Sequence, residues 1–301
     1  MTVFLSLTFS GVALGAIYFL AASGLSLIYG LMDILNFAHG LFMTLGAYAA
    51  WDAATHAPAS WGAPVIFVVA LVAAVLGGAL AAGLTEVLVI RPLYGRPISQ
   101  ILVTIGLDLA ATGLLLGAFG SNPQSLPVPL WMMEASHFAG VSLPNADYVA
   151  FAGGLVVLIA LEWFLRRTRY GIIIRAGVEN RTMVSALGIN VARAFTLVFV
   201  IGGAMAGLAG LLYAVVFSGE LVSPTQGDSL LIFAFIVVVI GGLGSIRGSA
   251  VAALMVGLVQ DYTNFYLGNH PGMAEIGNLS VVLLLAVVLE WRPRGLFGST
   301  L

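Results

Sequence analysis

The sequence predicts an all-α polytopic membrane protein, and three observations lead to this prediction. Hydrophobic residues make up 60% of the 301 positions and charged residues only 8%, whereas a soluble domain carries about 25% charged residues. Apolar runs long enough to cross a bilayer recur along the whole chain. The basic residues are confined to a few of the segments between these runs. We therefore expect one transmembrane domain over residues 1–301, embedded in a lipid bilayer.

The apolar runs are expected to form helices. In lipid, only helices and closed barrels satisfy the backbone polar groups, and barrel strands alternate apolar and polar residues over about 10 positions. These runs are longer and more evenly apolar. The sequence predicts about nine transmembrane helices, at Val3–Ile28, Ile34–Trp51, Pro64–Ile90, Ser99–Phe119, Tyr148–Leu165, Phe195–Phe217, Leu230–Gly244, Ser249–Phe265 and Ile276–Trp291.

Two of these segments leave the number of spans open. Leu230–Gly244 and Ser249–Phe265 are short, and they flank the glycine-rich sequence GGLGSIRGS. Residues 230–265 therefore form either two short spans or a re-entrant pair, and eight full spans are the alternative to nine.

Pairs of glycines four positions apart predict close contacts between helices, because small residues let backbones approach each other in lipid. Such contacts lie either within one subunit or at a seam between subunits, and both remain open. The pairs are Gly11/Gly15, Gly113/Gly117, Gly203/Gly207 and Gly244/Gly248.

The arginines predict the orientation of the chain in the membrane. The loops 52–63, 120–147, 218–229 and 266–275 contain no arginine. When the spans alternate, all eleven arginines fall on one side, which the positive-inside rule identifies as the cytoplasm. We expect the N-terminus outside and the C-terminus in the cytoplasm, which requires an odd number of spans. The arginines are Arg91, Arg96, Arg166, Arg167, Arg169, Arg175, Arg181, Arg193, Arg247, Arg292 and Arg294.

Residue types that the chain lacks exclude several kinds of chemistry. Without cysteine there are no disulfides or thiolate metal sites. Without lysine there is no Walker A phosphate loop and no Schiff-base chemistry, so any ATP must be bound by another chain. No catalytic set of residues stands out, and no metal site is expected because the histidines share no ligand spacing; these are His39, His56, His137 and His270.

The longest loop rich in arginine, residues 166–194, contains a predicted short helix at Gly177–Gly188. Glu179 in its first turn favours the positive end of the helix, and Gly188 supplies a C-terminal stop. A short, capped, partly apolar helix suits docking in a groove of another protein. The alternative is a surface loop whose arginines only set the topology.

Four sequence stretches point to a known family. They are RAGVENRTMVSALGIN in the long loop, GLSLIYGLMDILNFAHG near the N-terminus, GGLGSIRGS, and RPRGLFG at Arg292 to Gly298. Together they resemble the coupling loop, the signature centred on Asn36 to Gly40, the second glycine motif and the ending of the LivH type of branched-chain amino-acid ABC permease. The resemblance covers nearly the whole chain in order.

This resemblance implies a permease subunit that passes branched-chain or similar small amino acids inward across a bacterial inner membrane. It implies partners: a second, LivM-like permease, two cytoplasmic ATPase subunits that bind the ATP, and a periplasmic solute-binding protein. It implies no enzyme activity, no cofactor in this chain and no nucleic acid. Residues 166–194 would be the coupling loop, and the positions that would meet an ATPase are Glu179, Asn180, Arg181, Ala186, Leu187 and Gly188.

Four positions depart from the family pattern. Leu41 stands where an acidic residue is usual, Asp33 precedes the signature, Arg247 replaces a common proline, and Asp108 lies in a span that is usually uncharged. These departures leave the solute open among branched-chain amino acids, urea, short amides and aromatic acids. Whether the permease pair is a heterodimer or a homodimer also stays open.

Two polar stripes within the predicted spans are candidates for a substrate pathway, because polar groups at bilayer depth face the protein interior or water. Interhelical hydrogen bonding is the alternative role. The first stripe, with His39 at its edge, follows helical spacing through Asp33, Asn36, Gly40, Thr44 and Ala47.

The second stripe consists of Thr104, Asp108 and Thr112. Asp108 is either a neutral structural acid or a counter-charge for a substrate ammonium. A proton-coupled secondary transporter that relays protons through Asp33, His39 and Asp108 is the alternative function. The sequence shows no internal repeat of the kind typical of such transporters.

Overall fold

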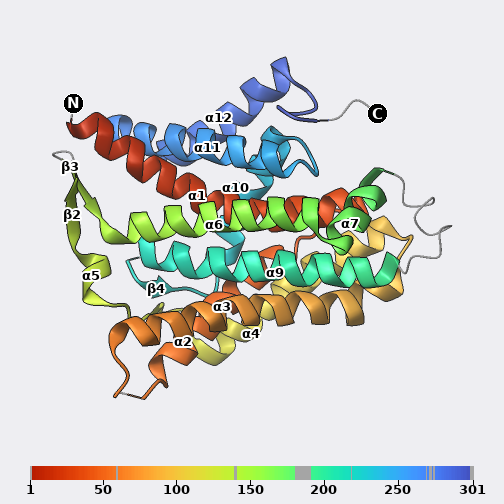
Figure 1. Ribbon diagram of the computed structural model, residues 1–301, viewed down its shortest axis with the longest axis horizontal. Coiled ribbons are helices and arrows are strands. Elements are labelled where there is room, and N and C mark those ends of the chain that lie inside the picture. The colour runs from red at the N-terminus through yellow and green to blue at the C-terminus, as the bar shows by residue number, and fades with distance from the viewer. Residues whose placement is uncertain are drawn as a thin grey trace.

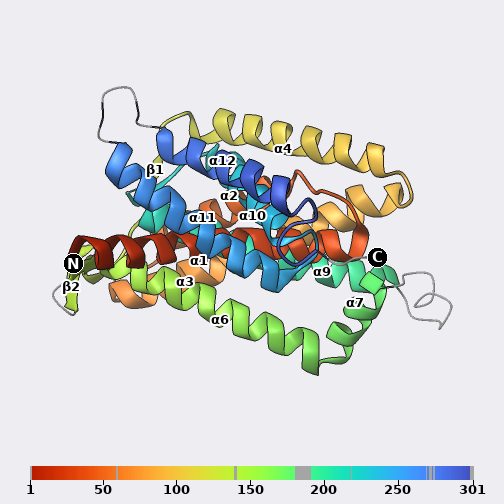
Figure 2. The same ribbon diagram turned by 90° about the horizontal axis from the view of Figure 1, so that it is seen from above.

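The structure is a computed structural model that describes residues 2–58, 60–138, 141–179, 191–217, 219–268, 270, 273 and 275–298. It is mostly helical, as the sequence predicts, and the long helices run roughly along the longest axis of the molecule (Figure 1). Helix α1 starts at one end of this axis, and α7 lies at the other (Figures 1 and 2).

Each apolar segment predicted from the sequence contains a helix. These helices are α1 Thr2–Met32, α2 His39–Thr55, α3 Ala63–Thr85, α4 Pro97–Phe119, α6 Asn145–Arg167, α9 Val191–Val216, α10 Gln226–Gly241, α11 Ile246–Leu267 and α12 Ile276–Trp291. The shorter helices are η1 Glu86–Ile90 and η2 Arg91–Leu93, which continue α3, together with α5 Leu130–Met133 and α7 Arg169–Glu179.

Local sequence signals explain several helix boundaries. Proline in the first turn starts α3 and α4, since its missing N–H costs nothing there. Gly120 ends α4 with a φ of 75°, a conformation that glycine adopts without strain. Ser245 caps α11, because its side chain accepts a hydrogen bond from the N–H of Gly248 at 3.1 Å.

Within the described residues, five helices are long and apolar enough to cross a membrane: α1, α3 with its continuation to Leu93, α4, α6 and α9. The pair α10 and α11 bends by 119° at the break between them, which fits a broken span or a re-entrant loop. Helices α2 and α12 are shorter, with 17 and 16 residues. The chain is therefore polytopic, while the count of nine spans and the sides of the termini remain predictions.

Helices α1 and α9 form the centre of the bundle. More than half of the residues in the apolar stretch of each are buried, and both contribute to the largest hydrophobic core. Helices α4 and α6 run along opposite edges of the bundle (Figure 2). Their apolar side chains are largely exposed, as expected of side chains that face lipid.

Glycine brings the central helices into backbone contact. A Cβ atom on Gly207 of α9 would lie 2.1 Å from the carbonyl oxygen of Ala74 in α3, and one on Gly257 of α11 would lie 2.4 Å from the carbonyl oxygen of Gly11 in α1. Two of the predicted glycine pairs, Gly11/Gly15 and Gly203/Gly207, therefore pack within the chain. Gly113/Gly117 differs, because a Cβ at either position would meet no atom within 4 Å.

Among the described residues, four short strands lie between the long helices. The antiparallel pair of β2 (Ala135–Phe138) and β3 (Val141–Pro144) lies at the end of the molecule that holds the N-terminus (Figure 1). The second antiparallel pair joins β1 (Gln124–Ser125) to β4 (Leu221–Val222). These strands belong to two of the loops that contain no arginine, 120–147 and 218–229.

The start of one predicted span was wrong. This span was predicted to begin at Ile34, but the chain between α1 and α2 is not helical and α2 begins only at His39. Asp33 causes this break by adopting a φ of 58°, which a right-handed helix does not accommodate. Of the predicted helix at Gly177–Gly188, the structure describes only the first three residues, which form the end of α7. Ile174 buries the apolar face of α7 against the bundle, and residues 180–188 lie outside the described residues.

The glycine contacts predict opposite effects of one substitution at two positions. Gly207→Ala should lower the free energy of unfolding by about 1–3 kcal/mol, because the new Cβ overpacks the contact with α3. Gly113→Ala should leave it unchanged or raise it slightly, since alanine favours the helix and the site is open. Thermal unfolding of the purified variants in detergent measures both. Equal midpoints for the two variants would contradict the close backbone contact between α3 and α9.

Candidate functional site

The inner face of α4 is the most unusual polar feature of the described residues. Of the 23 residues of this helix, only Gln100 and Thr104 are buried, and Asp108 follows them at the same helical spacing. The outer face is apolar and exposed, with Leu102 at 64% and Leu109 at 68%. A helix of a soluble protein buries its apolar face. Helix α4 instead buries polar side chains and exposes apolar ones, as expected of a helix between lipid and a polar interior.

The break between α1 and α2 places Asn36 against this face. The side-chain oxygen Oδ1 of Asn36 accepts a hydrogen bond from the N–H of Ala38 at 3.1 Å. The backbone N–H of Phe37, which precedes Ala38, donates to Oγ1 of Thr104 in α4 at 3.4 Å. Asn36 and Thr104, which the sequence assigned to two separate stripes, thus lie at one contact between the break and α4.

Asp108 faces an acidic residue that the sequence analysis did not single out. Its carboxyl group interacts with that of Asp228, in the first turn of α10. We call Asn36, Gln100, Thr104, Asp108 and Asp228 the α4 polar seam. An acid at the start of an apolar segment was the available signal for Asp228. Its partner becomes visible only because α10 packs against α2.

Gly40 and Thr44 have structural contacts between α2 and α10. Oγ1 of Thr44 accepts a hydrogen bond from the N–H of Gly227 at 3.1 Å. A Cβ atom on Gly40 would lie 3.1 Å from the carbonyl oxygen of Gly227. Both residues are buried, so they hold the first turn of α10 against α2.

His39 is fully buried and turned toward α1. Its Nε2 lies 3.0 Å from the carbonyl oxygen of Ala21, and its ring meets Phe42 edge-on at 5.9 Å between centroids. Asp33 is exposed at the end of α1. In the described residues no hydrogen bond or ion pair joins Asp33, His39 and Asp108, so the structure does not assemble the proton relay considered from the sequence.

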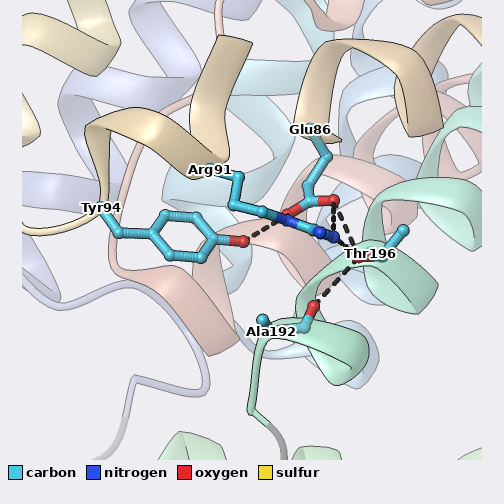
Figure 3. Close-up of polar contacts among 5 residues, drawn as sticks. All are labelled: Glu86, Arg91, Tyr94, Ala192 and Thr196. Atoms are coloured by element: carbon cyan, nitrogen blue, oxygen red, sulfur yellow. Dashed lines mark hydrogen bonds and ion pairs between the residues drawn. The ribbon is translucent and has the colours of Figure 1, made fainter. Parts of the chain in front are cut away.

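A buried carboxylate joins the start of α9 to the turn between α3 and α4 (Figure 3). Glu86 is 0% exposed, and its Oε2 lies 3.0 Å from Nη2 of Arg91 and 2.8 Å from Oγ1 of Thr196. Nη2 of Arg91 also donates to Oγ1 of Thr196 at 2.7 Å. Tyr94 donates its hydroxyl proton to Oε1 of Glu86. Burial, and next the hydrogen bond to Glu86, raise the pKa of Tyr94, so this phenol stays a neutral donor.

Several of the described segments that carry arginine contact one another. Glu162 of α6 forms ion pairs with Arg166 at 2.8 Å and with Arg247, in the first turn of α11, at 2.5 Å. Arg175 of α7 and Arg247 line the same surface pocket as Phe297 near the C-terminus. These three arginines therefore lie close together, while the side of the membrane on which they lie stays a prediction.

The predicted ATPase contacts lie at the edge of what the structure describes. Glu179 is the last residue of α7, and nothing is described of its side chain. Asn180, Arg181, Ala186, Leu187 and Gly188 lie outside the described residues. In the part of the chain that the structure covers, no group of three or more histidines and acids could hold a metal ion.

Comparisons with known proteins agree on one family. Residues 7–289 match the family model described as branched-chain amino acid transport system / permease component. The chain is 29% identical to the high-affinity branched-chain amino acid transport system permease protein LivH of Escherichia coli, over 98% of this chain and 96% of that protein. It is 30% identical to a probable LivH of Methanocaldococcus jannaschii, over 93% and 88%. It is 29% identical to the permease protein LivM of Salmonella typhimurium, over 94% and 68%. No solved structure matches.

The cluster around Glu86 makes a prediction about stability. Arg91→Ala should lower the free energy of unfolding more than the control does, because it leaves a buried carboxylate without its cation. The double variant Arg91→Ala/Glu86→Gln should recover part of this loss, since a neutral amide needs no cation. Thermal unfolding in detergent measures both, and Arg96→Ala, at an exposed position of the same turn, is the control. A double variant less stable than Arg91→Ala would show that the charge pair is not what holds this contact.

Proposed function

The chain belongs to the branched-chain amino acid transport system / permease component family, and from this premise we propose that it is the membrane subunit of an ABC importer. In this proposal it passes branched-chain or similar small amino acids inward across a bacterial inner membrane. The observation that carries the proposal is similarity to LivH proteins over nearly the full length of the chain and of the relatives. The whole chain, residues 1–301, then acts as one permease domain.

The energy comes from other subunits in this proposal. A Walker A loop requires lysine, and the chain has none. Two cytoplasmic ATPase subunits would bind and hydrolyse the ATP, and no cofactor would reside in this chain. A LivM-like protein would be the second permease, since this chain is similar to a LivM protein along most of its length. A periplasmic solute-binding protein would deliver the amino acid.

The proposed orientation places the end rich in arginine in the cytoplasm. The ion pairs of Glu162 and the shared pocket gather several arginines there, and cytoplasmic loops are enriched in arginine. The start of α1 lies at the opposite end of the molecule from α7 (Figures 1 and 2), whereas Phe297 lines one pocket with Arg175 and Arg247. This fits nine crossings, with α10 and α11 as two short spans, the N-terminus outside and the C-terminus inside.

Residues 166–194 are the proposed coupling loop, with ATPase contacts at Glu179, Asn180, Arg181, Ala186, Leu187 and Gly188. The described residues support a mechanical role for this loop. Helix α9 begins within its last residues, at Val191. Thr196 near the start of α9 contacts Glu86 and Arg91 at the turn that leads into α4. A displacement of the loop would therefore reach α4 through hydrogen-bonded groups rather than through lipid.

The proposed pathway runs along the α4 polar seam. The carboxyl groups of Asp108 and Asp228 would act as counter-charge for the α-ammonium group of an amino acid. Asn36 and Thr104 would lie behind them in the wall of the same seam. His39, Gly40 and Thr44 would shape the wall, because they fix α1, α2 and α10 relative to one another. Asp33 would lie at the exposed end of this pathway.

A proton-coupled secondary transporter is the second candidate, and the Asp108–Asp228 pair favours it. Acidic groups inside membranes mark ion and proton pathways as well as substrate sites. The two candidates differ in the source of energy, which a transport assay separates.

The test is uptake of radiolabelled leucine into proteoliposomes. Liposomes that hold this chain with its LivM-like partner and the two ATPases should take up leucine only when the solute-binding protein and ATP are supplied. Uptake should persist when a protonophore removes the pH gradient, and it should stop when the Walker A lysine of the ATPases is replaced. Uptake by this chain alone on a proton gradient would overturn the proposal in favour of the second candidate.

A further inference from the structure

A small buried cavity lies where α4 meets the break between α1 and α2. It offers about 10 Å³ of space for the centre of a water-sized sphere. Three polar residues line it, Asn36, Gln100 and Thr104, and they are 2%, 1% and 0% exposed. The rest of the lining is apolar, from α1, the break itself, η1 and α9.

The backbone fixes which atoms of the two amides are free. Oδ1 of Asn36 is engaged as the acceptor for the N–H of Ala38, so Nδ2 is the free atom. Nε2 of Gln100 donates to the carbonyl oxygen of Leu93 at 2.7 Å, so Oε1 is the free atom. Both free atoms are buried and have no protein partner. Neither amide can be flipped without losing its backbone hydrogen bond.

The free atoms define the chemistry of what fits between them. The N–H groups of Asn36 require an acceptor, and the carbonyl of Gln100 requires a donor. Buried groups of this kind are almost always hydrogen-bonded, to protein or to ordered water. A cavity of this size holds one water molecule, and a water needs two or more polar partners to stay there. A metal ion does not fit, since a cation would be repelled by the N–H groups.

We infer that this cavity binds a single structural water molecule, which accepts a hydrogen bond from Nδ2 of Asn36 and donates one to Oε1 of Gln100. The water seats α4 on the α1–α2 break. Few direct hydrogen bonds hold α4 in this region; they are Gln100–Leu93 and Phe37–Thr104. A water contact breaks and forms again without repacking of side chains, so this joint lets α4 shift relative to the bundle. The inference does not depend on which solute the chain carries.

Radical footprinting of the purified wild-type chain tests the inference directly. X-ray pulses generate hydroxyl radicals from water, and bound water therefore oxidises buried side chains beside it. Met32 lines the cavity, and Met205 does not, although both are 6% exposed. We expect Met32 to be oxidised several times faster than Met205. Equal rates would overturn the inference.

Two substitutions show whether the polar pair is the cause. Asn36→Leu and Gln100→Leu each remove one partner of the water, so each should reduce the oxidation rate of Met32 to that of Met205. Gln226→Leu is the matched control, because Gln226 is buried and hydrogen-bonded to the carbonyl oxygen of Gly210, away from the cavity. Fast oxidation of Met32 in both cavity variants would contradict the inference, since the radicals would then come from another water.

The unfolding midpoints of the same variants give an independent readout. If one water joins the two amides, either substitution removes the whole bridge. Gln100→Leu should then shift the midpoint much less in the Asn36→Leu variant than in the wild-type chain. Additive shifts for Asn36→Leu and Gln100→Leu, as expected for the control pair Asn36→Leu and Gln226→Leu, would show two independent groups and overturn the bridge.

Discussion

The inability of hydrocarbon to form hydrogen bonds is the constraint on which this structure depends. Each backbone or side-chain polar group at membrane depth needs a partner inside the protein or in water that the protein encloses. This explains why the apolar segments are helices, and why the polar side chains of α4 point toward the bundle while its leucines are exposed. It also explains why the break between α1 and α2 is tolerated: the backbone there lies within the protein and is bonded to Asn36 and Thr104.

Close packing of helix backbones determines which polar groups at membrane depth lie near one another. The hydrophobic effect gives little net drive between helices in lipid, so contact area between small residues becomes decisive. At the contact of α9 with α3, and at that of α11 with α1, there is no room for even a Cβ atom. The tight central bundle leaves α4 as a loosely attached helix at the edge (Figure 2). The Glu86 cluster then connects this helix to the start of α9, which follows the proposed coupling loop.

Patterns local in sequence were predicted well, and contacts between distant segments were not. The positions of the long helices follow from apolar runs with proline and glycine at their ends, which act within a few residues. The stripe through Asp33 and Asn36 failed as a helical face because the left-handed backbone of Asp33 ends α1. Glu86, Gln100 and Asp228 were missed for another reason. Their roles arise from partners on other segments, such as Thr196, which lies 110 positions after Glu86.

The central claim is that α4 stands between lipid and a polar interior, and oxygen accessibility along this helix tests it most directly. The chain has no cysteine, so single spin-labelled cysteines can be placed at successive positions of α4 in the chain reconstituted alone in liposomes. Collision rates with molecular oxygen, which concentrates in lipid, should rise and fall with helical period. The account predicts high values at Ile98, Leu102 and Leu109 and low values at Gln100, Thr104 and Asp108. Uniform rates around the helix, or the highest rates at the polar positions, would contradict it.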